Sequence, residues 1–375
     1  MRPPHSDTPS ADNPSADVPS AGLPAAPGGH APADPPGLPL AALGGYLSDR
    51  GFEAPALSAE LIAGGKSNLT YTVTTRTATG GGRTRVLRRP PLGHVLATAH
   101  DMGREYRVLS ALAPTAVPVP EVYLLCGDPE VIGAPFYLME LVEGTVYRDR
   151  SQTESLDAER ARAISWALTD VLADLHAVDP AAVGLGDFGR PEGYLDRQVA
   201  RWGKQLAASR SRDVPGIDEL HAALGTGVPA SQRAAIVHGD YRLDNAIVGA
   251  DDRIAAVLDW EMATLGDPLA DLGLMCVYWT ELDSIGSGAL TSAVDPALGF
   301  PDAGALVARY AERSGLDVSP LPWYVAFGYF KLAVIAEGIH FRFLQGKTVG
   351  PGFEGMGAMV PALVARGLDT LREGR

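Results

Sequence analysis

The sequence predicts an α+β protein of two lobes, a β-rich first lobe with one main helix and a largely helical second lobe. Short apolar runs separated by glycine-containing turns lie between residues 57 and 142, which is typical of strands. Apolar residues then recur at helical spacing from residue 156 onward. A chain of 375 residues also exceeds the usual size of one hydrophobic core. We therefore expect an N-lobe over residues 38–140 and a C-lobe over residues 141–375.

Residues 1–37 differ in composition from the rest of the chain. They are rich in proline and alanine, repeat Pro-Ser-Ala-Asp, and carry almost no large apolar side chains. Such a segment buries too little apolar surface to offset the entropy of ordering. We expect a disordered tail, followed by a helix over residues 40–50 whose Leu40, Leu43 and Leu47 share one face.

The N-lobe should open with two strands joined by a glycine turn, between residues 57 and 75. The small residues of the turn at 64–68 would let backbone N–H groups approach phosphate oxygens, and Ser67 would add a hydroxyl. The turn is not a P-loop, so an ordinary hairpin turn is the alternative. A strand ending at Arg89 and a helical run around Glu105 follow.

The C-lobe should begin with a long helix over residues 156–178, in which His176 on the last turn is expected to be structural. A basic helix follows, with Arg197, Arg201 and Lys204 at positions i, i+4 and i+7. The late apolar segment 323–343 is expected to be mainly core, with some residues forming a wall of a substrate site.

Composition excludes several classes of protein. A net charge of −14 argues against nucleic-acid binding, which needs clustered cations. No apolar run approaches the ~18 residues of a membrane span, and no signal peptide is evident, so we expect a cytoplasmic protein that does not bind membranes. Cys126 and Cys276 lie in apolar stretches without metal-ligand spacing and are expected to be reduced and buried.

The segment from His238 to Asn245 and the Leu258-Asp259 pair carry the main chemical signal. Apolar runs at 246–248 and 254–258, separated by a polar turn, read as a hairpin that returns Asp259 to Asn245. Transfer of a phosphoryl group needs a carboxylate to orient the attacking hydroxyl and oxygen ligands to hold Mg²⁺. Asp240 can serve as the first, and Asn245 with Asp259 as the second, so the pattern predicts phosphoryl transfer.

These segments resemble the aminoglycoside phosphotransferase family, also called choline-kinase-like small-molecule kinases. The resemblance extends from residue 57 to residue 346 and rests on LTYTV, VLRRPP, HGDYRLDN and LDWEMATLGDPLADLG. The sequences of these motifs are most similar to those of the branch fused to acyl-CoA dehydrogenases. The resemblance implies a bilobal protein-kinase-like fold that binds ATP and Mg²⁺ between its lobes and phosphorylates a small molecule.

The resemblance also implies roles for particular residues. Arg88 would contact the nucleotide phosphates and Glu105 would hold Arg88, with Arg89 as the solvated neighbour, although Glu105 in a surface ion pair is the alternative. Backbone groups of Glu140 and Val142 in the hinge would bind adenine. In the C-lobe, Arg242 would stabilise the transferring phosphoryl group, with a surface role as the alternative. His238 and Asp271 would support the catalytic loop. Glu261 is expected to make a structural contact, with a second metal ion as the alternative.

The acceptor is expected to be the hydroxyl of a small molecule, bound by helices at about 190–232 and 320–346. If Arg197, Arg201 and Lys204 line its site, they favour an anionic acceptor such as a hydroxyacyl-CoA or a hydroxy acid; a solvated helix face is the alternative. An antibiotic O-phosphotransferase and a catalytically silent pseudokinase remain open, and the intact Asp240, Asn245 and Asp259 argue against the second. A protein kinase is disfavoured because the sequence lacks Asp-Phe-Gly and Ala-Pro-Glu.

Overall fold

The structure is a computed structural model that describes residues 34–54, 56–62, 68–76, 81–92, 101–279, 292–348 and 352–374. The chain divides into two units, Met1–Asp34 and Pro35–Arg375, and the architecture below is that of the second. Most of the predicted tail and Ser67 fall outside the described residues.

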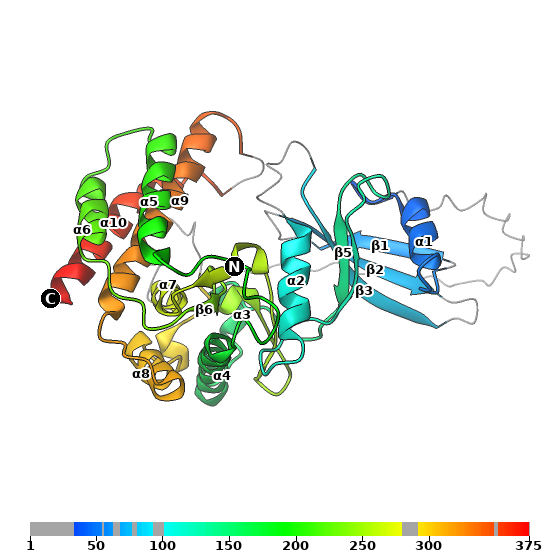
Figure 1. Cartoon of the computed structure of the whole chain (residues 1–375), viewed down its shortest axis with the longest axis horizontal. Coiled ribbons are helices and arrows are strands. Elements are labelled where there is room, and N and C mark those ends of the chain that lie inside the picture. The colour runs from blue at the N-terminus through cyan, green and yellow to red at the C-terminus, as the bar shows by residue number, and fades with distance from the viewer. Residues whose placement is uncertain are drawn as a thin grey trace, which may run out of the picture. The chain divides into compact units, whose positions relative to one another are not determined.

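The N-lobe is built on one antiparallel sheet of five strands in the order β1-β2-β3-β5-β4. Its strands are β1 (Ala56–Leu61), β2 (Leu69–Arg76), β3 (Gly82–Arg89), β4 (Val122–Cys126) and β5 (Phe136–Glu140). Helix α1 (Leu40–Ser48) packs against β1, and α2 (Met102–Leu112) packs against β4 and β5 (Figure 1). The α+β character predicted for this half is confirmed.

Alternation along the strands produces the small-lobe core. Tyr71 and Val73 of β2 are buried with Leu87 of β3, and Leu43 and Leu47 of α1 cover them. The predicted face of the first helix is therefore the face that packs. The chain just before α1 is also tied to the sheet, because the Tyr71 hydroxyl donates to the carbonyl of Pro36 at 2.5 Å.

Arg89 differs from its expected role. It is 4% exposed rather than solvated, and its guanidinium donates to the carbonyls of Gly37 and, at 3.0 Å, Ile132. Strand alternation explains the difference, because Arg88 and Arg89 face opposite sides of β3 and both sides of this sheet are covered. Arg89 therefore links the segments that contain Gly37 and Ile132 to strand β3.

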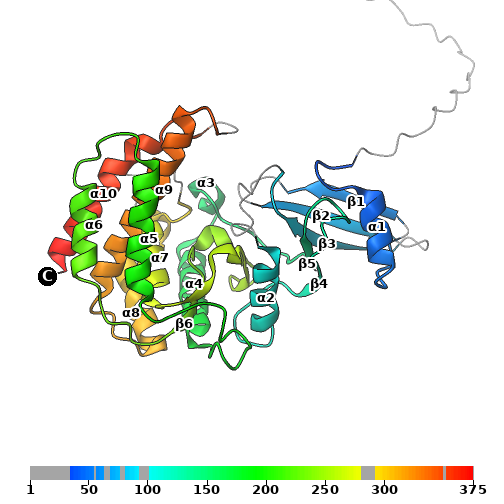
Figure 2. The ribbon, with the colours of Figure 1, turned by 45° about the horizontal axis from the view of Figure 1, so that its top comes forward.

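The C-lobe is helical around a buried central helix, α9 (Leu321–Leu344). Four helices pack on α9 (Figure 2). They are α5 (Tyr194–Ser209), α6 (Ile217–Thr226), α7 (Leu269–Trp279) and α10 (Met356–Glu373). The aromatic residues of α9 are mostly buried, so this segment is core, as predicted. A helix that is apolar on all sides needs such a complete cover.

The remaining helices flank this group. Helix α4 (Ala158–Ala177) starts at Asp157, whose carboxylate accepts hydrogen bonds from two backbone N–H groups of the first turn. Helix α8 (Ala303–Ser314) packs on α4. The short α3 (Arg150–Thr153) precedes α4 in the chain. Among the helices that the structure describes, none combines the length and apolar character that a membrane span requires.

Two short antiparallel pairs carry the segments singled out by sequence. Strand β6 (Ala235–Val237) pairs with β9 (Thr264–Gly266), and β7 (Ala246–Val248) pairs with β8 (Ile254–Val257). The second pair is the predicted hairpin. Its register places Leu258 opposite Asn245, with the N–H of Leu258 donating to the carbonyl of Asn245 at 2.8 Å.

Candidate active site

A cavity of about 660 Å³ lies between the N-lobe sheet and the β7–β8 hairpin. One part of its wall is apolar and includes Val86, Met139, Ile247 and Val257. Another part is strongly polar. Its charged and amide residues are Asn68, Arg88, Glu140, Arg148, Asp240, Arg242, Asp244, Asn245, Asp259 and Glu261. An apolar wall beside a charged one suits a ligand with a flat apolar part and an anionic part.

The loop after β6 presents Asp240. Gly239 has a φ of +85°, and a Cβ there would lie 3.0 Å from Met262, so only glycine fits this turn easily. The buried Asp271 carboxylate accepts from the N–H of His238 at 2.6 Å and of Gly239 at 2.8 Å. His238 is fully buried and its Nε2 lies 2.8 Å from the carbonyl of Leu258. His238 and Asp271 thus lie beneath the loop.

Asp271 is itself held by a second histidine. Nε2 of His176 lies 3.3 Å from Oδ2 of Asp271, and Nδ1 of His176 lies 2.7 Å from the Tyr310 hydroxyl. Burial alone would raise the pKa of Asp271, but His176 and His238 together hold that pKa below its ordinary value. Asp271 is therefore an ionised acceptor, and His176 has the structural position expected of it.

Both oxygens of the Asp240 carboxylate accept a side-chain hydrogen bond. Nδ2 of Asn245 donates to Oδ2 of Asp240 at 3.0 Å and to its main-chain carbonyl at 2.8 Å, while the Tyr278 hydroxyl donates to Oδ1 at 3.0 Å. Because the amide nitrogen of Asn245 serves Asp240, its carbonyl oxygen is the atom it can offer to a cation. Nε of Arg242 lies 3.8 Å from Oδ2 of Asp240.

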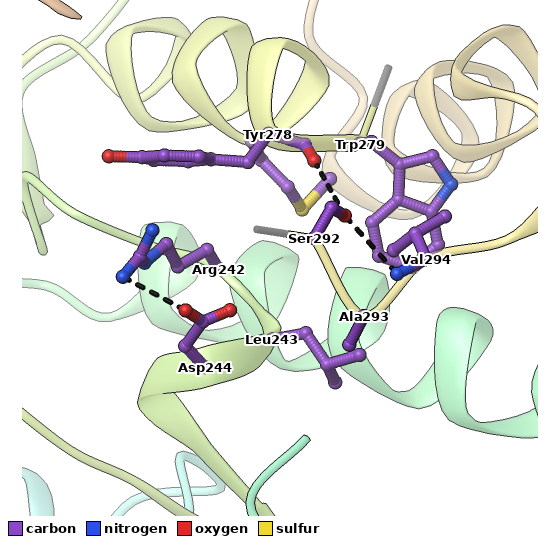
Figure 3. A pocket seen from close by; sticks show the side chains of 9 residues that line it. Arg242, Leu243, Asp244, Tyr278, Trp279, Ser292, Ala293 and Val294 are labelled. Atoms are coloured by element: carbon purple, nitrogen blue, oxygen red, sulfur yellow. Dashed lines mark hydrogen bonds and ion pairs between the residues drawn. The ribbon is translucent and has the colours of Figure 1, made fainter. Parts of the chain in front are cut away.

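A second, very small hollow of about 10 Å³ is lined in part by Arg242, Asp244 and Tyr278 (Figure 3). Arg242 turns toward Asp244, its NH2 lying 3.0 Å from Oδ2, and its guanidinium lies 4.6 Å from the centre of the Tyr278 ring. Ser292 and Val294 close the opposite wall. The hollow has room for one water molecule at most, so the larger cavity is the one that can hold a substrate.

Asp259 and Arg88 connect the lobes. Asp259, two residues after the end of β8, adopts a left-handed conformation with φ +65°, which is rare for a residue other than glycine. Its Oδ1 is ion-paired with NH2 of Arg88, and Nε of Arg88 lies 2.9 Å from Glu105. Glu105 also accepts from the Tyr137 hydroxyl at 2.8 Å. The structure therefore joins Arg88 to Glu105 inside the cleft, and Glu105 is not a surface ion pair.

Burial and neighbouring charges act against each other on the pKa values of Arg88 and Glu105. Glu105 is 1% exposed, and burial raises its pKa although Arg88 opposes the rise. Burial would lower the pKa of Arg88, but Glu105, followed by Tyr137 and Asp259, outweighs burial and the pKa is raised. Nδ2 of Asn68 donates to Glu105 at 3.0 Å and to Glu261 at 3.2 Å. Glu261 therefore makes a structural contact.

Two sets of oxygens could hold a metal ion. One oxygen from each of Glu105, Asp259 and Glu261 lies within 4.8 Å of the others. Glu105 already receives hydrogen bonds or ion pairs from three side chains, which makes it a poor ligand. Asn245 and Asp259 fit better, because both line the cavity and offer the hard oxygen donors that Mg²⁺ prefers.

The hinge and the basic helix have less defined roles. Glu140 and Val142 both line the cavity, and the N–H of Glu140 donates to the carbonyl of Glu121 at 2.8 Å. Arg197, Arg201 and Lys204 lie on α5 outside the cavity wall. The guanidinium of Arg197 folds back onto the carbonyls of Arg190 and Glu192. Arg201 and Lys204 are exposed.

Comparison with known proteins decides the family. Residues 58–311 match the model of the phosphotransferase enzyme family. The chain belongs to this family. A solved structure from Ralstonia eutropha that is named after aminoglycoside phosphotransferases is 35% identical, with a TM-score of 0.76 over 89% of this chain and 98% of that one. Choline kinase from Cryptosporidium parvum, at 10% identity and a TM-score of 0.58, shares the fold over 88% of this chain and 95% of that one.

Curated relatives of this phosphotransferase-family chain bear a different name. Acyl-CoA dehydrogenase family member 11 of Gallus gallus is 36% identical over 84% of this chain and 40% of the relative. Family member 10 of Mus musculus is 39% identical over 76% of this chain and 26% of the relative. The chain thus spans two fifths or less of these relatives. The predicted fold, the family and its acyl-CoA dehydrogenase branch are confirmed.

Proposed function

We propose that the protein transfers the γ-phosphoryl group of Mg·ATP to a hydroxyl of a small molecule. The observation that carries the proposal is the meeting of Asp240, Asn245 and Asp259 in the lining of one cavity, with Arg88 ion-paired to Asp259. The apolar wall suits adenine, and the hinge residues Glu140 and Val142 would bind its edge. Ser67 would contribute from the glycine turn.

The chain's own groups would divide the work of transfer. Asp240 orients the acceptor hydroxyl and accepts its proton, since Asn245 and Tyr278 fix the carboxylate in place. Arg242 lies beside Asp240 and would stabilise charge on the transferring group. Arg88 would contact the phosphates of the nucleotide. Asn245 and Asp259 would hold Mg²⁺, which neutralises phosphate charge when bound.

For the acceptor we propose a hydroxyacyl-CoA or a hydroxy acid. The names of the curated relatives point to acyl-CoA chemistry, and Ile339 and Met356 give the cavity an apolar wall on the C-terminal helices. Each carboxylate that lines the cavity among the described residues already has a hydrogen-bond or ion-pair partner. These carboxylates are Glu140, Asp240, Asp244, Asp259 and Glu261.

A polycationic antibiotic needs carboxylates in the site that are not already paired within the protein. The pairing of these five carboxylates therefore disfavours such an acceptor. An antibiotic acceptor stays the second candidate because of the name of the Ralstonia eutropha structure. Arg197, Arg201 and Lys204 would steer an anionic acceptor toward the cleft from outside the cavity wall.

The experiment is a measurement of ADP release from Mg·ATP with a panel of hydroxyacyl-CoAs, hydroxy acids, amino alcohols, aminoglycosides and macrolides. Asp240→Asn should bind ATP as the wild type does and turn over about 10²-fold more slowly or worse, because the proton acceptor is gone. Asp251→Asn in the exposed hairpin turn is the matched control and should retain wild-type turnover. Asp240→Asn turnover within about twofold of wild type would remove Asp240 from its role.

A further inference from the structure

Lys331 is a charged residue inside the otherwise apolar middle of α9. It is 8% exposed, and its Nζ donates to the carbonyl of Gly239 at 2.5 Å. The Nζ also lies 5.6 Å from the centre of the Trp202 ring on α5. It does not line the large cavity, so it is not placed to contact a bound nucleotide. A buried ammonium that has this position calls for a reason other than packing.

Keeping an ammonium at this place is costly. Burial lowers the pKa of Lys331, and Arg201 adds to that effect, while Asp240 and Asp271 oppose it. An ammonium has three donors, and among the described residues the Gly239 carbonyl is its hydrogen-bond acceptor. Replacing a buried charge by a well-packed apolar side chain is often neutral or stabilising. Stability alone would therefore not select lysine here.

The Gly239 carbonyl is part of the peptide that leads into Asp240. The N–H of that same peptide donates to Nδ1 of His238 at 3.2 Å, so Lys331 and His238 hold its two ends. The preceding peptide is held by Asp271, which accepts from the N–H of Gly239. Since glycine offers no side chain to limit rotation, these contacts set the direction in which Asp240 leaves the loop.

We propose that Lys331 is a positioning residue that holds the Gly239–Asp240 peptide and thereby aims the Asp240 carboxylate. The inference rests on the proposed function of Asp240. Loss of the ammonium frees the peptide to rotate, and a displacement of about 1 Å at a catalytic group can cost 10²-fold in rate. Lys331 does not line the cavity proposed for ATP, so kcat should fall while the KM for ATP stays unchanged.

The test compares Lys331→Met with Lys347→Met, an exposed control with the same chemical change. Hydrogen exchange of a peptide covering residues 237–245 reports on the loop without any need for turnover. Lys331→Met should speed exchange in this peptide about tenfold or more, as expected for loss of one charged hydrogen bond, with peptides from α4 unchanged. Lys347→Met should leave the exchange rates of the 237–245 peptide and of the α4 peptides unchanged.

Turnover supplies the second measurement, as ADP release from Mg·ATP with the best acceptor of the panel or with water. Lys331→Met should lose kcat about tenfold to 10²-fold with the KM for ATP within twofold. In an Asp240→Asn background the same change should have little further effect, because Lys331 acts through Asp240. If Lys331 were merely structural, Lys331→Met would lower kcat by the same factor in the wild-type and the Asp240→Asn backgrounds.

The outcomes separate the two claims. Two results would overturn the role of Lys331 and leave the proposed function standing. One is a hydrogen-exchange rate of peptide 237–245 in Lys331→Met equal to that of the wild type. The other is an equal loss of kcat with and without the Asp240 carboxylate. A wild-type protein that releases no ADP counts against the proposed function, and the exchange comparison still decides whether Lys331 holds the loop.

Discussion

Replacing Asp271 by alanine should destabilise the protein strongly, because one buried and one half-buried N–H group would lose their acceptor. Asp271 is 1% exposed and accepts from the backbone of His238 and Gly239 at 2.6 and 2.8 Å. Each orphaned buried donor costs about 1–3 kcal/mol, so the free energy of unfolding should fall by about 2–6 kcal/mol. Asp369→Ala, an exposed carboxylate on α10, is the control and should change it by less than about 0.5 kcal/mol.

Urea unfolding at several pH values measures the effect. The pKa of Asp271 is lowered in the fold, so its carboxylate contributes stability above the ordinary pKa of about 3.9 that is lost as the pH falls through the lowered value. The gap between wild type and Asp271→Ala should therefore narrow as the pH falls below about 4. A loss under about 1 kcal/mol at pH 7, or a gap that widens in acid, would refute this account of the loop.

Three further predictions concern metal, tail and acceptor. Asp259→Ala should abolish Mg²⁺-dependent ATP binding in calorimetry, since a cation on the phosphates needs that carboxylate, and unchanged affinity would contradict the metal assignment. Deleting residues 1–33 should alter neither Tm nor turnover, because a proline-rich segment with few apolar side chains adds little stability; a Tm several degrees lower would show that it docks. Arg201→Glu should raise the KM for an anionic acceptor and leave the KM for ATP alone, with an effect that shrinks in high salt, whereas Arg366→Glu on α10 should do neither. Unaltered acceptor kinetics in Arg201→Glu would remove the basic helix from the acceptor site.

The sequence predicted those features that depend on local pattern. Strand alternation and a polar turn were enough to predict the β7–β8 hairpin, and its register brings Asp259 beside Asn245. Helical periodicity likewise predicted α1 and α4, and the core side of each. These features are local in the chain, so spacing along the sequence carries them.

Contacts between distant elements were beyond such reasoning. Tyr278 lies 38 positions from Asp240 and reaches it only because α7 packs beside the loop. Lys331 approaches Gly239 from α9, although a lone lysine in an apolar helix is a signal that could have drawn attention to it. Arg89 was expected in solvent because period alone does not tell which sides of a sheet are covered. Tertiary packing decided all three.

The central claim is phosphoryl transfer that depends on Asp240. The most direct measurement is ³¹P NMR of Mg·ATP incubated with the acceptor panel and with wild-type protein or Asp240→Asn. The account predicts a new phosphate monoester and an equal amount of ADP with the wild type, formed about 10²-fold more slowly with Asp240→Asn. A panel that yields no monoester while ATP binds normally, or a monoester formed equally fast by both proteins, would contradict it.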